Sequence, residues 1–394
     1  MLDDLGPIRS GDRLTIWRPA MTQPDARIAV TTALLAIPPT YFVTAHAEQL
    51  AASHPSWHFR INPLAANVRE GSTPLRVTPA LRGPLPYTMQ TRIAKFAMPL
   101  QARMVICQSP DLIHQHHGTW SGGAISASST CRVPLITTLH GTDVVHASRA
   151  RPRGLERAHA AQVHRAMQES LFLLPVSEHL RRLAIEAGAP ADRLHVHYQG
   201  IDTTFFTPAE GGATDRQPRI LYVGALIPRK RVDLVIRASQ ELAREQPHEL
   251  LIVGDGPQRS SLEALAGHEG HIRFLGPLDR EGVRSVMRTS DLLMLLSHSE
   301  GAGLVSLEAQ ACGMAVIVTD GDGKKEMIRD GITGTVVGAD ATPGAIARAA
   351  STWLPDNSQM RHEISTAARD FVVKERSVLT GASRLAEFYE SALG

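Results

Sequence analysis

The strongest constraint on the fold of this 394-residue chain is a repeated alternation of short apolar segments with helix-length amphipathic segments. The apolar segments are uninterrupted, which is typical of strands that are buried on both faces of a parallel sheet. Strands that alternate with helices favour an α/β fold with a doubly wound sheet. In the first half of the chain the expected strands cover residues 27–35, 104–107, 112–114, 135–139 and 171–174, and the first expected helix covers 42–53.

The alternation lapses at residues 207–218 and then starts again. This segment, TPAEGGATDRQP, is rich in the residues of turns and linkers. In the second half the expected strands cover residues 220–223, 250–253, 272–275, 292–296 and 315–318, and the expected helices cover 232–244, 258–266, 280–289 and 304–312. The sequence therefore predicts two Rossmann-like domains that face each other across a ligand-binding cleft at the carboxyl ends of their strands.

The chain length agrees with two domains, because a single core rarely grows beyond about 300 residues. We place an N-terminal domain at residues 1–205, a C-terminal domain at 216–378 and a final amphipathic helix at 379–394. Residues 1–25 carry only turn signals and could be an extension, so that Met21 is an alternative start.

Composition argues against several classes of protein. No apolar run approaches the roughly 20 residues that a membrane span needs, and the N-terminus lacks the apolar segment of a secretory signal. The three cysteines, Cys107, Cys131 and Cys312, show no metal-ligand spacing. We therefore expect free thiols and a cytoplasmic protein.

Charge is distributed unevenly along the chain. Residues 1–200 hold 20 Lys and Arg against 13 Asp and Glu, whereas the remainder holds 21 against 26. Unless this is compositional scatter, the two halves face different partners. Basic residues gather at 149–157 and, among apolar ones, at 87–105, so that this half could contact a phosphate-bearing acceptor or the inner face of an anionic membrane. Pro99 should interrupt any long helix there.

A cationic turn follows the first strand of the second series. Gly224 ends that strand, and Arg229, Lys230 and Arg231 precede the next helix. Backbone N–H groups at a helix start and a lysine ammonium both bind phosphate, so that the turn suits an anion; a solvated basic turn is the alternative. The next strand ends in VGDGP, which is not the GxGxxG of dinucleotide-binding enzymes and argues against an oxidoreductase.

The segment SHSEGAGLVSLEAQACG, residues 297–313, places Glu300 and Glu308 eight positions apart. Glu300 follows a strand, and Glu308 lies in an otherwise apolar helix. A buried carboxylate is costly unless it is hydrogen-bonded, and carboxylates only accept hydrogen bonds. Hydroxyl groups of a sugar or a ribose therefore fit these two residues, and a solvent-facing Glu308 is the alternative.

Several motifs together resemble the retaining glycosyltransferases of family 4, which have the GT-B fold of two Rossmann-like domains. The C-terminal half contains ILYVGALIPRKRVDLVIRA, LLIVGDGPQRSSLEAL and IRFLGPL, then the segment with the two glutamates and VIVTDGDGKKEMIRDGITG. The N-terminal half contains DLIHQHHGTW, PLITTLHGTDV, PVSEHLRR and HYQGIDTTFFTP. The resemblance covers roughly residues 27–390, with the motifs in the family's order and spacing.

The resemblance implies that the C-terminal domain binds a nucleotide sugar and that the N-terminal domain binds the acceptor. Lys230 would contact the diphosphate, and Glu308 would bind the ribose hydroxyls. His140 and Glu300 are the implied catalytic residues, because both lie beside the transferred sugar. The implied donor-binding residues are Gly224, Arg229, Lys230, Leu275, Leu278, Ala302, Gly303, Leu304 and Glu308, with the two leucines next to the base.

Three departures from the family's pattern bear on these assignments. The arginine that usually follows the first glycine turn is Ala225 here, so that Arg229 or Arg231 would have to supply a phosphate cation. The usual apolar-proline pair is Lys324–Lys325, which we place on a solvated loop rather than near the cleft. The usual glycine-rich N-terminal loop is IPPTY, residues 37–41, which would reshape the acceptor end.

Histidines and a tryptophan after the strand at 112–114 belong to the expected acceptor side. His116 and His117 could hydrogen-bond acceptor hydroxyls or phosphate, and Trp120 could either stack on a sugar or lie in the core. With His114 they could also hold zinc, but no cysteine or carboxylate joins them in sequence. We therefore expect no metal site.

The sequence thus predicts an enzyme that moves a sugar from a nucleotide diphosphate sugar, a UDP-sugar ahead of a GDP-sugar, to a hydroxyl of a glycan, a lipid-linked sugar or a small metabolite. The resemblance implies retention of the anomeric configuration, no cofactor and a final helix that crosses back to the first domain. A nucleotide-sugar epimerase or hydrolase of the same fold and, because of Ala225, a degenerate binding module are the alternatives. We expect no nucleic-acid partner.

Overall fold

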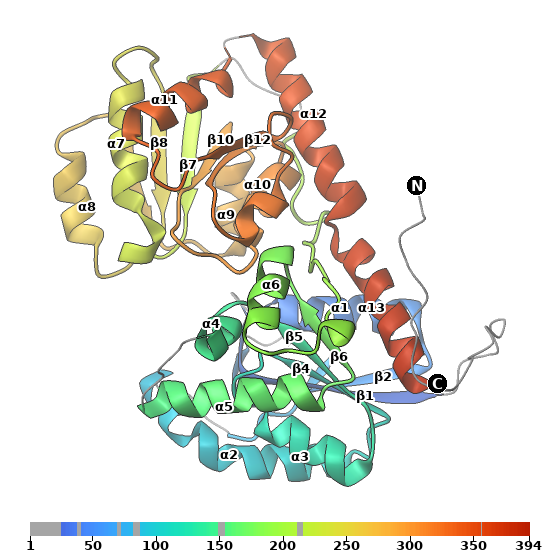
Figure 1. Ribbon diagram of the computed structural model, residues 1–394. Helices are drawn as coiled ribbons and strands as arrows, with labels where there is room; N and C mark the ends of the chain where they lie inside the picture. The colour runs from blue at the N-terminus through green and yellow to red at the C-terminus, as the bar shows by residue number, and fades with distance from the viewer. Residues whose placement is uncertain are drawn as a thin grey trace.

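The computed structural model describes residues 25–37, 41–68, 72–81, 87–148, 154–210, 216–355 and 357–394. Two units follow each other along the chain, blue to green and yellow to red in Figure 1, and each is built on a six-stranded parallel sheet. The expected α/β fold with two doubly wound sheets is therefore confirmed. The expectations for the N-terminal extension, for residues 38–40 of the proline loop and for 149–153 of the basic segment lie outside the described residues.

The first sheet has the strand order β3-β2-β1-β4-β5-β6. Its strands are β1 (Ala26–Ile37), β2 (Trp57–Val68), β3 (Arg76–Val77), β4 (Leu112–His116), β5 (Leu135–Leu139) and β6 (Phe172–Pro175). The helices of this unit are α1 (Phe42–Ser53), α2 (Tyr87–Cys107), α3 (Gly122–Cys131), α4 (Thr142–Ser148), α5 (Gly154–Glu169), α6 (Glu178–Glu186) and the short η1 (Ala191–Arg193).

The second sheet repeats this topology, with the order β12-β11-β10-β7-β8-β9. Its strands are β7 (Arg219–Val223), β8 (Glu249–Val253), β9 (Ile272–Gly276), β10 (Leu292–Leu295), β11 (Ala315–Thr319) and β12 (Gly334–Val337). The helices are η2 (Pro228–Lys230), α7 (Val232–Leu242), α8 (Arg259–Ala266), α9 (Arg280–Met287), α10 (Leu304–Ala311), η3 (Gly323–Met327), α11 (Pro343–Thr352), α12 (Ser358–Glu375) and α13 (Val378–Leu393). In both sheets the strand order reverses beside the first strand of the unit, and ligands of such sheets bind at the carboxyl ends of the strands at this point.

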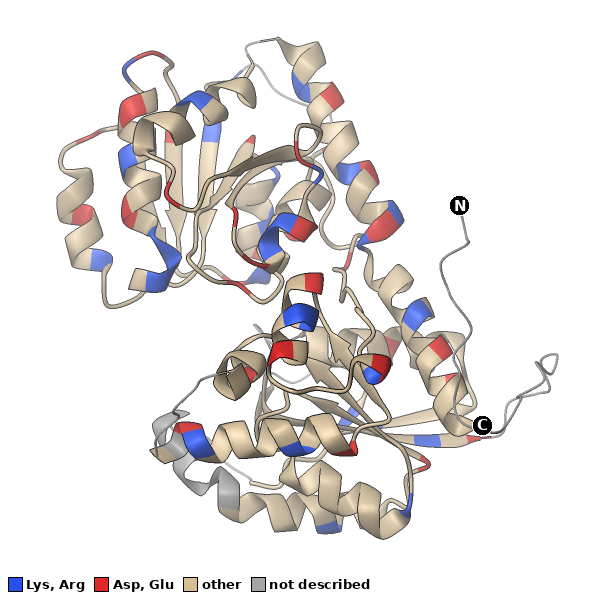
Figure 2. Cartoon of the chain, in the orientation of Figure 1, with Lys and Arg blue, Asp and Glu red and all other residues tan. Residues whose placement is uncertain are grey.

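The burial of the strands explains why apolar segments in the sequence predicted their positions. All four residues of β10, LLML, and all five of β11, AVIVT, are buried, as expected for strands that are covered on both faces. Figure 2 shows the complementary pattern, because most of the charged residues lie on helices and connecting loops rather than in the sheets.

Two expectations for the first unit were wrong. Residues 104–107 form the end of α2 and not a strand; a short apolar run such as MVIC cannot be told from a buried helical segment by periodicity alone. Pro99 lies inside α2 at an exposed position, and the helix continues through it. Buried Ala97, Ala102 and Val105 pack this part of α2 against the unit and offset the cost of the proline.

The last helix of the chain packs on the first unit. Leu385, Ala386 and Tyr389 of α13 lie in one apolar cluster with Leu50 of α1 and Trp57 of β2. Figure 1 shows α13, in red, running beside the blue elements of the first unit, while α12 lies along the second. The core of the first unit is therefore completed by residues from the far end of the sequence.

A second connection joins the units near the cleft. The Glu326 carboxylate in η3 accepts hydrogen bonds from the backbone N–H groups of Glu178 and His179, at 2.8 and 2.9 Å, and from the Tyr198 hydroxyl at 2.9 Å. These N–H groups begin α6, so that the carboxylate also meets the positive end of the helix dipole. Among the described residues the three cysteines are free, and no helix is long and apolar enough to cross a membrane.

Candidate active site

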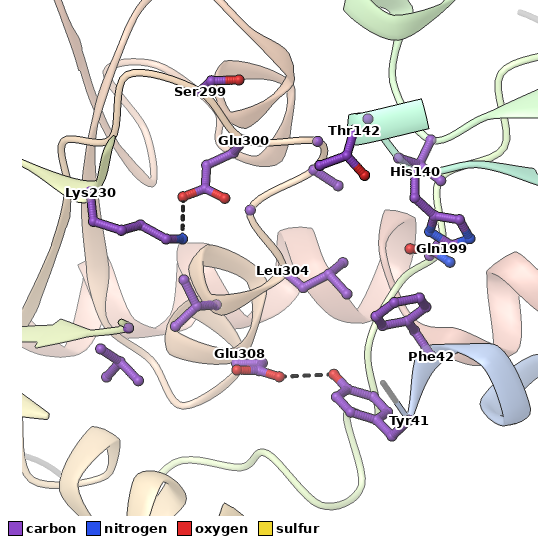
Figure 3. Close-up of a pocket in the computed structure, with 18 of the residues that line it drawn as sticks. Tyr41, Phe42, His140, Thr142, Gln199, Lys230, Ser299, Glu300, Leu304 and Glu308 are labelled. Atoms are coloured by element: carbon purple, nitrogen blue, oxygen red, sulfur yellow. Dashed lines mark hydrogen bonds and ion pairs between the residues drawn. The ribbon is translucent and has the colours of Figure 1, made fainter. Parts of the chain in front are cut away.

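A cleft of about 830 Å³ lies between the two units, at the carboxyl ends of their strands. The second unit contributes the turn after β7, the start of α9 and the loop that leads from β10 into α10. The first unit contributes the start of α1 and the turns after β4 and β5. Figure 3 shows Lys230, Glu300 and Glu308 on one side of this cleft and Tyr41, Phe42 and His140 on the other.

Lys230 and Glu300 form an ion pair at the base of the cleft. Lys230 is the last residue of η2, and its Nζ lies 2.5 Å from Oε1 of Glu300. Both side chains are largely buried, with 16% and 12% of their surface exposed. The half-exposed Arg229 adds a second positive charge 3.9 Å from Oε2 of Glu300 and donates to the Ser299 carbonyl. A diphosphate in this cleft would compete with Glu300 for the Lys230 ammonium.

The glycines beside Glu300 allow the two units to approach each other. A Cβ atom on Gly301 would lie only 2.0 Å from the backbone oxygen of His140, and one on Gly141 would lie 3.1 Å from the Cα of Gly301. Gly303 has a φ of 63° and precedes the first residue of α10. A side chain is therefore excluded at 301 and disfavoured at 303.

Glu308 faces the cleft from the first turns of α10 and has a partner from the other unit. Its Oε1 accepts a hydrogen bond of 2.8 Å from the Tyr41 hydroxyl (Figure 3). Burial raises the pKa of Glu308, although the bond from Tyr41 and the charge of Arg280 act in the opposite direction. Burial and Glu308 together raise the pKa of Tyr41 well above its usual value, so that Tyr41 remains a hydrogen-bond donor. The partly buried carboxylate thus receives a hydroxyl, which is the contact that a ribose would supply.

Arg280 is a residue of the cleft that sequence reasoning missed. It is the first residue of α9, and its guanidinium lies 4.7 Å from the ring centre of Tyr41 and 4.0 Å from that of Phe205. Its Nη2 is 3.6 Å from a carboxylate oxygen of Asp202. Asp279, which precedes Arg280, caps α9 by accepting a hydrogen bond from the Gly282 N–H. An aspartate of this kind marks a helix start in the sequence, and it could have drawn attention to the arginine that follows it.

His140 lies in the turn after β5, where the Asp143 carboxylate accepts from the backbone N–H groups of His140 and Gly141. Its ring packs on Phe42, with the ring centres 5.0 Å apart, and on His117, at 4.1 Å. Burial, assisted by the neighbouring histidines, holds the pKa of His140 well below its ordinary value. His140 is therefore neutral near pH 7 and can donate a hydrogen bond from one nitrogen while it accepts at the other.

Behind His140, further buried histidines lead towards α13. The Nδ1 of His116 lies 3.1 Å from the Nε2 of His140, and the Nδ1 of His114 lies 2.6 Å from the Tyr389 hydroxyl. The Nε2 of His197 is 2.8 Å from the Gly381 carbonyl of the same helix. Among the described residues no group of three or more histidine, cysteine, aspartate or glutamate side chains is placed to hold a metal ion.

Most of the predicted donor residues line the cleft. They are Gly224, Arg229, Lys230, Leu278, Ala302, Gly303, Leu304 and Glu308, together with the expected catalytic residues His140 and Glu300 and with His117 of the expected acceptor side. The unpredicted lining residues include Tyr41, Phe42, Thr142, His146, His179, Gln199 and Arg280. Thr142, His179 and Gln199 lie within motifs of the resemblance, but nothing in the sequence singled out these positions.

Several expected positions differ from the structure. Trp120 is buried in a core cluster with Leu64 and Ala97, so that its side chain fills the core instead of offering a face to a sugar. Leu275 packs against the main apolar core, while Leu278 reaches the cleft. His116 lies behind His140 rather than in the lining.

The expected roles of two cationic positions change as well. Arg231 donates to the Ala339 carbonyl at 2.8 Å, which leaves Arg229 as the neighbouring cation in the cleft. The solvated-loop placement was wrong for Lys324, which is fully buried and paired with Asp322. The solvated-loop placement is correct for Lys325, whose side chain is exposed.

Two family models match successive parts of the chain. Residues 43–205 match the model described as Glycosyltransferase Family 4, and residues 205–371 match that of Glycosyl transferases group 1. The chain belongs to glycosyltransferase family 4. The two matches together cover most of both units, and they agree with the resemblance that the motifs indicated.

Curated relatives in the family include a D-inositol 3-phosphate glycosyltransferase of Nocardia farcinica, 32% identical over 252 residues. That match spans 58% of this chain and only 55% of the relative. A D-inositol 3-phosphate glycosyltransferase of Salinispora arenicola is 30% identical over 301 residues, 66% of this chain and 64% of the relative.

Solved structures of glycosyltransferases share the whole fold at low identity. Sucrose-phosphate synthase from Thermosynechococcus elongatus superposes with a TM-score of 0.76 at 17% identity and covers 93% of this chain and 98% of its own. Anabaena HepE, solved in complex with UDP, gives 0.72 at 19% identity and covers 93% and 100%. Two six-stranded sheets and these neighbours establish the GT-B fold.

We expect the melting temperature of the protein to fall as the pH is lowered below 6.5. Burial lowers the pKa of His114 to about 3 and that of His197 to about 4, from the ordinary 6.5. Between these values and 6.5 the unfolded chain binds protons that the folded chain does not, so that stability is complete above pH 6.5 and lost as the pH falls. At pH 5 each histidine would cost about 2 kcal/mol.

The measurement is differential scanning fluorimetry over this pH range, with His114→Gln and the exposed control His58→Gln. His114→Gln should reduce the pH dependence of the free energy of unfolding by up to about 1.4 kcal/mol per pH unit. An unchanged pH dependence in this variant would contradict the assignment.

Proposed function

We propose that this chain is a retaining glycosyltransferase that transfers a sugar from a UDP-sugar to an acceptor hydroxyl. The observation that carries the proposal is the cleft itself, where the Lys230 ammonium is paired with Glu300 and where a second carboxylate, Glu308, and the neutral His140 also belong to the lining. A cation for a diphosphate and two hydrogen-bond acceptors for hydroxyl groups suit a nucleotide sugar.

Each part of the donor has a partner in this arrangement. The diphosphate binds the ammonium of Lys230 and the guanidinium of Arg229. Arg229 supplies the positive charge of the family's usual arginine, whose position is occupied by Ala225 in this chain. The ribose hydroxyls donate to Glu308 in place of Tyr41. The transferred sugar donates to Glu300 and lies against the backbone of residues 302–304 at the start of α10, and Leu278 borders the base. The complexes of Anabaena HepE with UDP and with UDP-glucose support uridine as the base.

In the reaction, the bond between the anomeric carbon and the diphosphate oxygen breaks, and a bond from the acceptor oxygen to that carbon forms on the same face. The acceptor hydroxyl transfers its proton to an oxygen of the departing diphosphate. Lys230 and Arg229 stabilise the negative charge that develops on the diphosphate in a cleft with little water. His140 is neutral and acts as a hydrogen-bond partner of the sugar, and closure of the two units excludes water.

The acceptor would enter from the first unit, where Thr142, His146 and His179 join His117 in the lining. Hydroxyl and imidazole groups can bind either hydroxyls or a phosphate. Because the curated relatives are named as D-inositol 3-phosphate glycosyltransferases, a phosphorylated cyclitol is the first acceptor to test.

The direct test is a thermal-shift screen of UDP- and GDP-sugars, followed by transfer assays with inositol 3-phosphate and with simple sugars. A donor that binds only the folded protein raises its melting temperature. We expect the largest shift with a UDP-sugar, and product formation that requires the acceptor and retains the anomeric configuration by NMR. Epimerisation or hydrolysis at the same rate without any acceptor would favour the alternative enzyme class, and the absence of any shift would contradict the proposal.

The roles of Lys230 and Glu308 predict losses of donor affinity. Lys230→Ala and Glu308→Ala should each weaken binding of the best donor about 10- to 150-fold, because each removes a hydrogen bond that involves a charged group. Isothermal titration calorimetry measures this loss. Arg231→Gln and Glu263→Ala are matched controls outside the cleft and should bind like the parent protein. If Lys230→Ala binds normally, the diphosphate must be held by Arg229 instead.

We further propose that the first unit contacts an anionic membrane surface. Phe96 and Leu100 of α2 are exposed, at 72% and 45% of their surface. Arg60, Arg76 and Arg103 border a shallow groove of about 440 Å³ together with Leu100. Apolar side chains next to arginines are the combination that binds anionic lipid.

Co-sedimentation with vesicles tests this contact. The parent protein should bind vesicles of phosphatidylcholine mixed with phosphatidylglycerol and not those of phosphatidylcholine alone. Arg60→Gln/Arg76→Gln/Arg103→Gln should weaken this binding by about 3 kcal/mol, roughly 100-fold. A matched triple variant on the second unit, Arg237→Gln/Arg244→Gln/Arg273→Gln, should bind normally. Equal losses in both variants would show only a general effect of net charge.

A further inference from the structure

Asp322 and Lys324 form a buried ion pair directly behind the cleft. The Nζ of Lys324 lies 2.8 Å from Oδ2 of Asp322, and their side chains are 0% and 3% exposed. The Oδ1 of Asp322 accepts from the backbone N–H of Lys324 at 3.0 Å and so begins η3. The next lysine differs, since Lys325 is 43% exposed and pairs with the exposed Asp320.

The same carboxylate holds the backbone of Glu300. Oδ2 of Asp322 accepts from the Glu300 N–H at 2.7 Å, so that one oxygen receives both the ammonium and this amide. Glu300 therefore has its side chain on Lys230 and its backbone on Asp322. Both ends of the residue are fixed by charged partners.

The rest of the loop lies against the same segment. A Cβ atom on Gly323 would lie 2.3 Å from the carbonyl oxygen of Gly301, and one on Gly303 would lie 3.3 Å from the Cβ of Lys324. Residues 322–324 thus support residues 300–303 from the side opposite to the cleft. In a close-packed contact of this kind, a change in one segment moves the other.

The buried Lys324 ammonium compensates the negative charge of Asp322. Removing one partner of a buried ion pair leaves an uncompensated charge and is strongly unfavourable, whereas neutral residues of similar shape can replace the whole pair. Lys324 does not reach the cleft, so that its ammonium cannot bind the donor directly. Its partner is Asp322, and Asp322 bonds the residue that would hold the transferred sugar.

We infer that the Asp322–Lys324 pair is a positioning pair for the transferred sugar. Asp322 fixes the Glu300 amide, and Lys324 compensates the charge of the Asp322 carboxylate and orients it for that bond. The effect should appear with the sugar nucleotide rather than with free UDP, because UDP has no transferred sugar for Glu300 to bind. This inference rests on the proposed function, since it assumes that Glu300 binds the sugar of the donor.

Two double variants isolate the bond to the Glu300 amide. Asp322→Asn/Lys324→Met keeps an acceptor for this amide, whereas Asp322→Ala/Lys324→Met removes it. Both are without a buried charge, so that they differ in the acceptor and not in charge compensation. Lys325→Met is the control for loss of a lysine from the same turn.

The readout is the ratio of the affinities for UDP-glucose and for UDP, measured by calorimetry, together with kcat and KM for UDP-glucose. We expect the asparagine variant and Lys325→Met to keep the ratio of the parent within about 3-fold. The alanine variant should lose about 10-fold or more in this ratio and in kcat, with its affinity for UDP unchanged, because the Glu300 amide is left without a partner.

The outcomes separate the inference from the proposed function. Equal ratios in the two double variants, or parallel losses of UDP and UDP-glucose affinity in the alanine variant, would overturn the inference alone and leave a purely structural pair. If the parent protein binds neither UDP nor UDP-glucose, the proposed donor fails, and the inference fails with it.

Discussion

Charge compensation at the carboxyl edge of the second sheet is the interaction on which the cleft depends. The loops after β7, β10 and β11 bring charged side chains close together where little of their surface is exposed. Lys230 is paired with Glu300, Lys324 with Asp322, and Glu308 with the Tyr41 hydroxyl. An unpaired charge in such a place would cost several kcal/mol, so that these pairs decide which loop conformations are stable.

The pairs differ in how readily they can be exchanged. Lys230 and Glu300 line the cleft, where the proposed nucleotide sugar would bring an anion for one and hydroxyl groups for the other. The pair of Asp322 and Lys324 lies behind the loop and has no route to a ligand. In the proposed function, the first pair would exchange partners when the donor binds, and the second pair would keep the loop in place.

The sequence predicted much of this because the fold and the lining of the cleft both depend on local patterns. Continuous apolar runs marked the buried strands, and Glu300 and Glu308 stood out as carboxylates in an apolar setting. The apolar run at 104–107 failed as a predictor, because a buried helix can have the same composition. β2 was missed in turn, since Pro63 lies within it and proline ordinarily argues against a strand.

Some residues have roles that depend on side chains far away in the sequence, and these roles could not be predicted. Nothing near Lys324 in the sequence reveals that its ammonium is buried against Asp322, since two lysines in a glycine-rich stretch resemble a solvated loop. Tyr41 and Arg280 are 239 positions apart and meet only because the two units close on each other. Trp120 had two equally reasonable roles, and only the packing of Leu64 and Ala97 around it decides for the core.

The position of α13 has a consequence for how the protein is made. Domains usually fold as units during synthesis, with the N-terminal one first. Here the apolar cluster of the first unit includes Leu385, Ala386 and Tyr389, which leave the ribosome after the whole second unit. The first domain to be synthesised is therefore the last to be completed, and until then it exposes the face of α1 that α13 will cover. Formation of the cleft should accordingly be a late and cooperative event that involves both units.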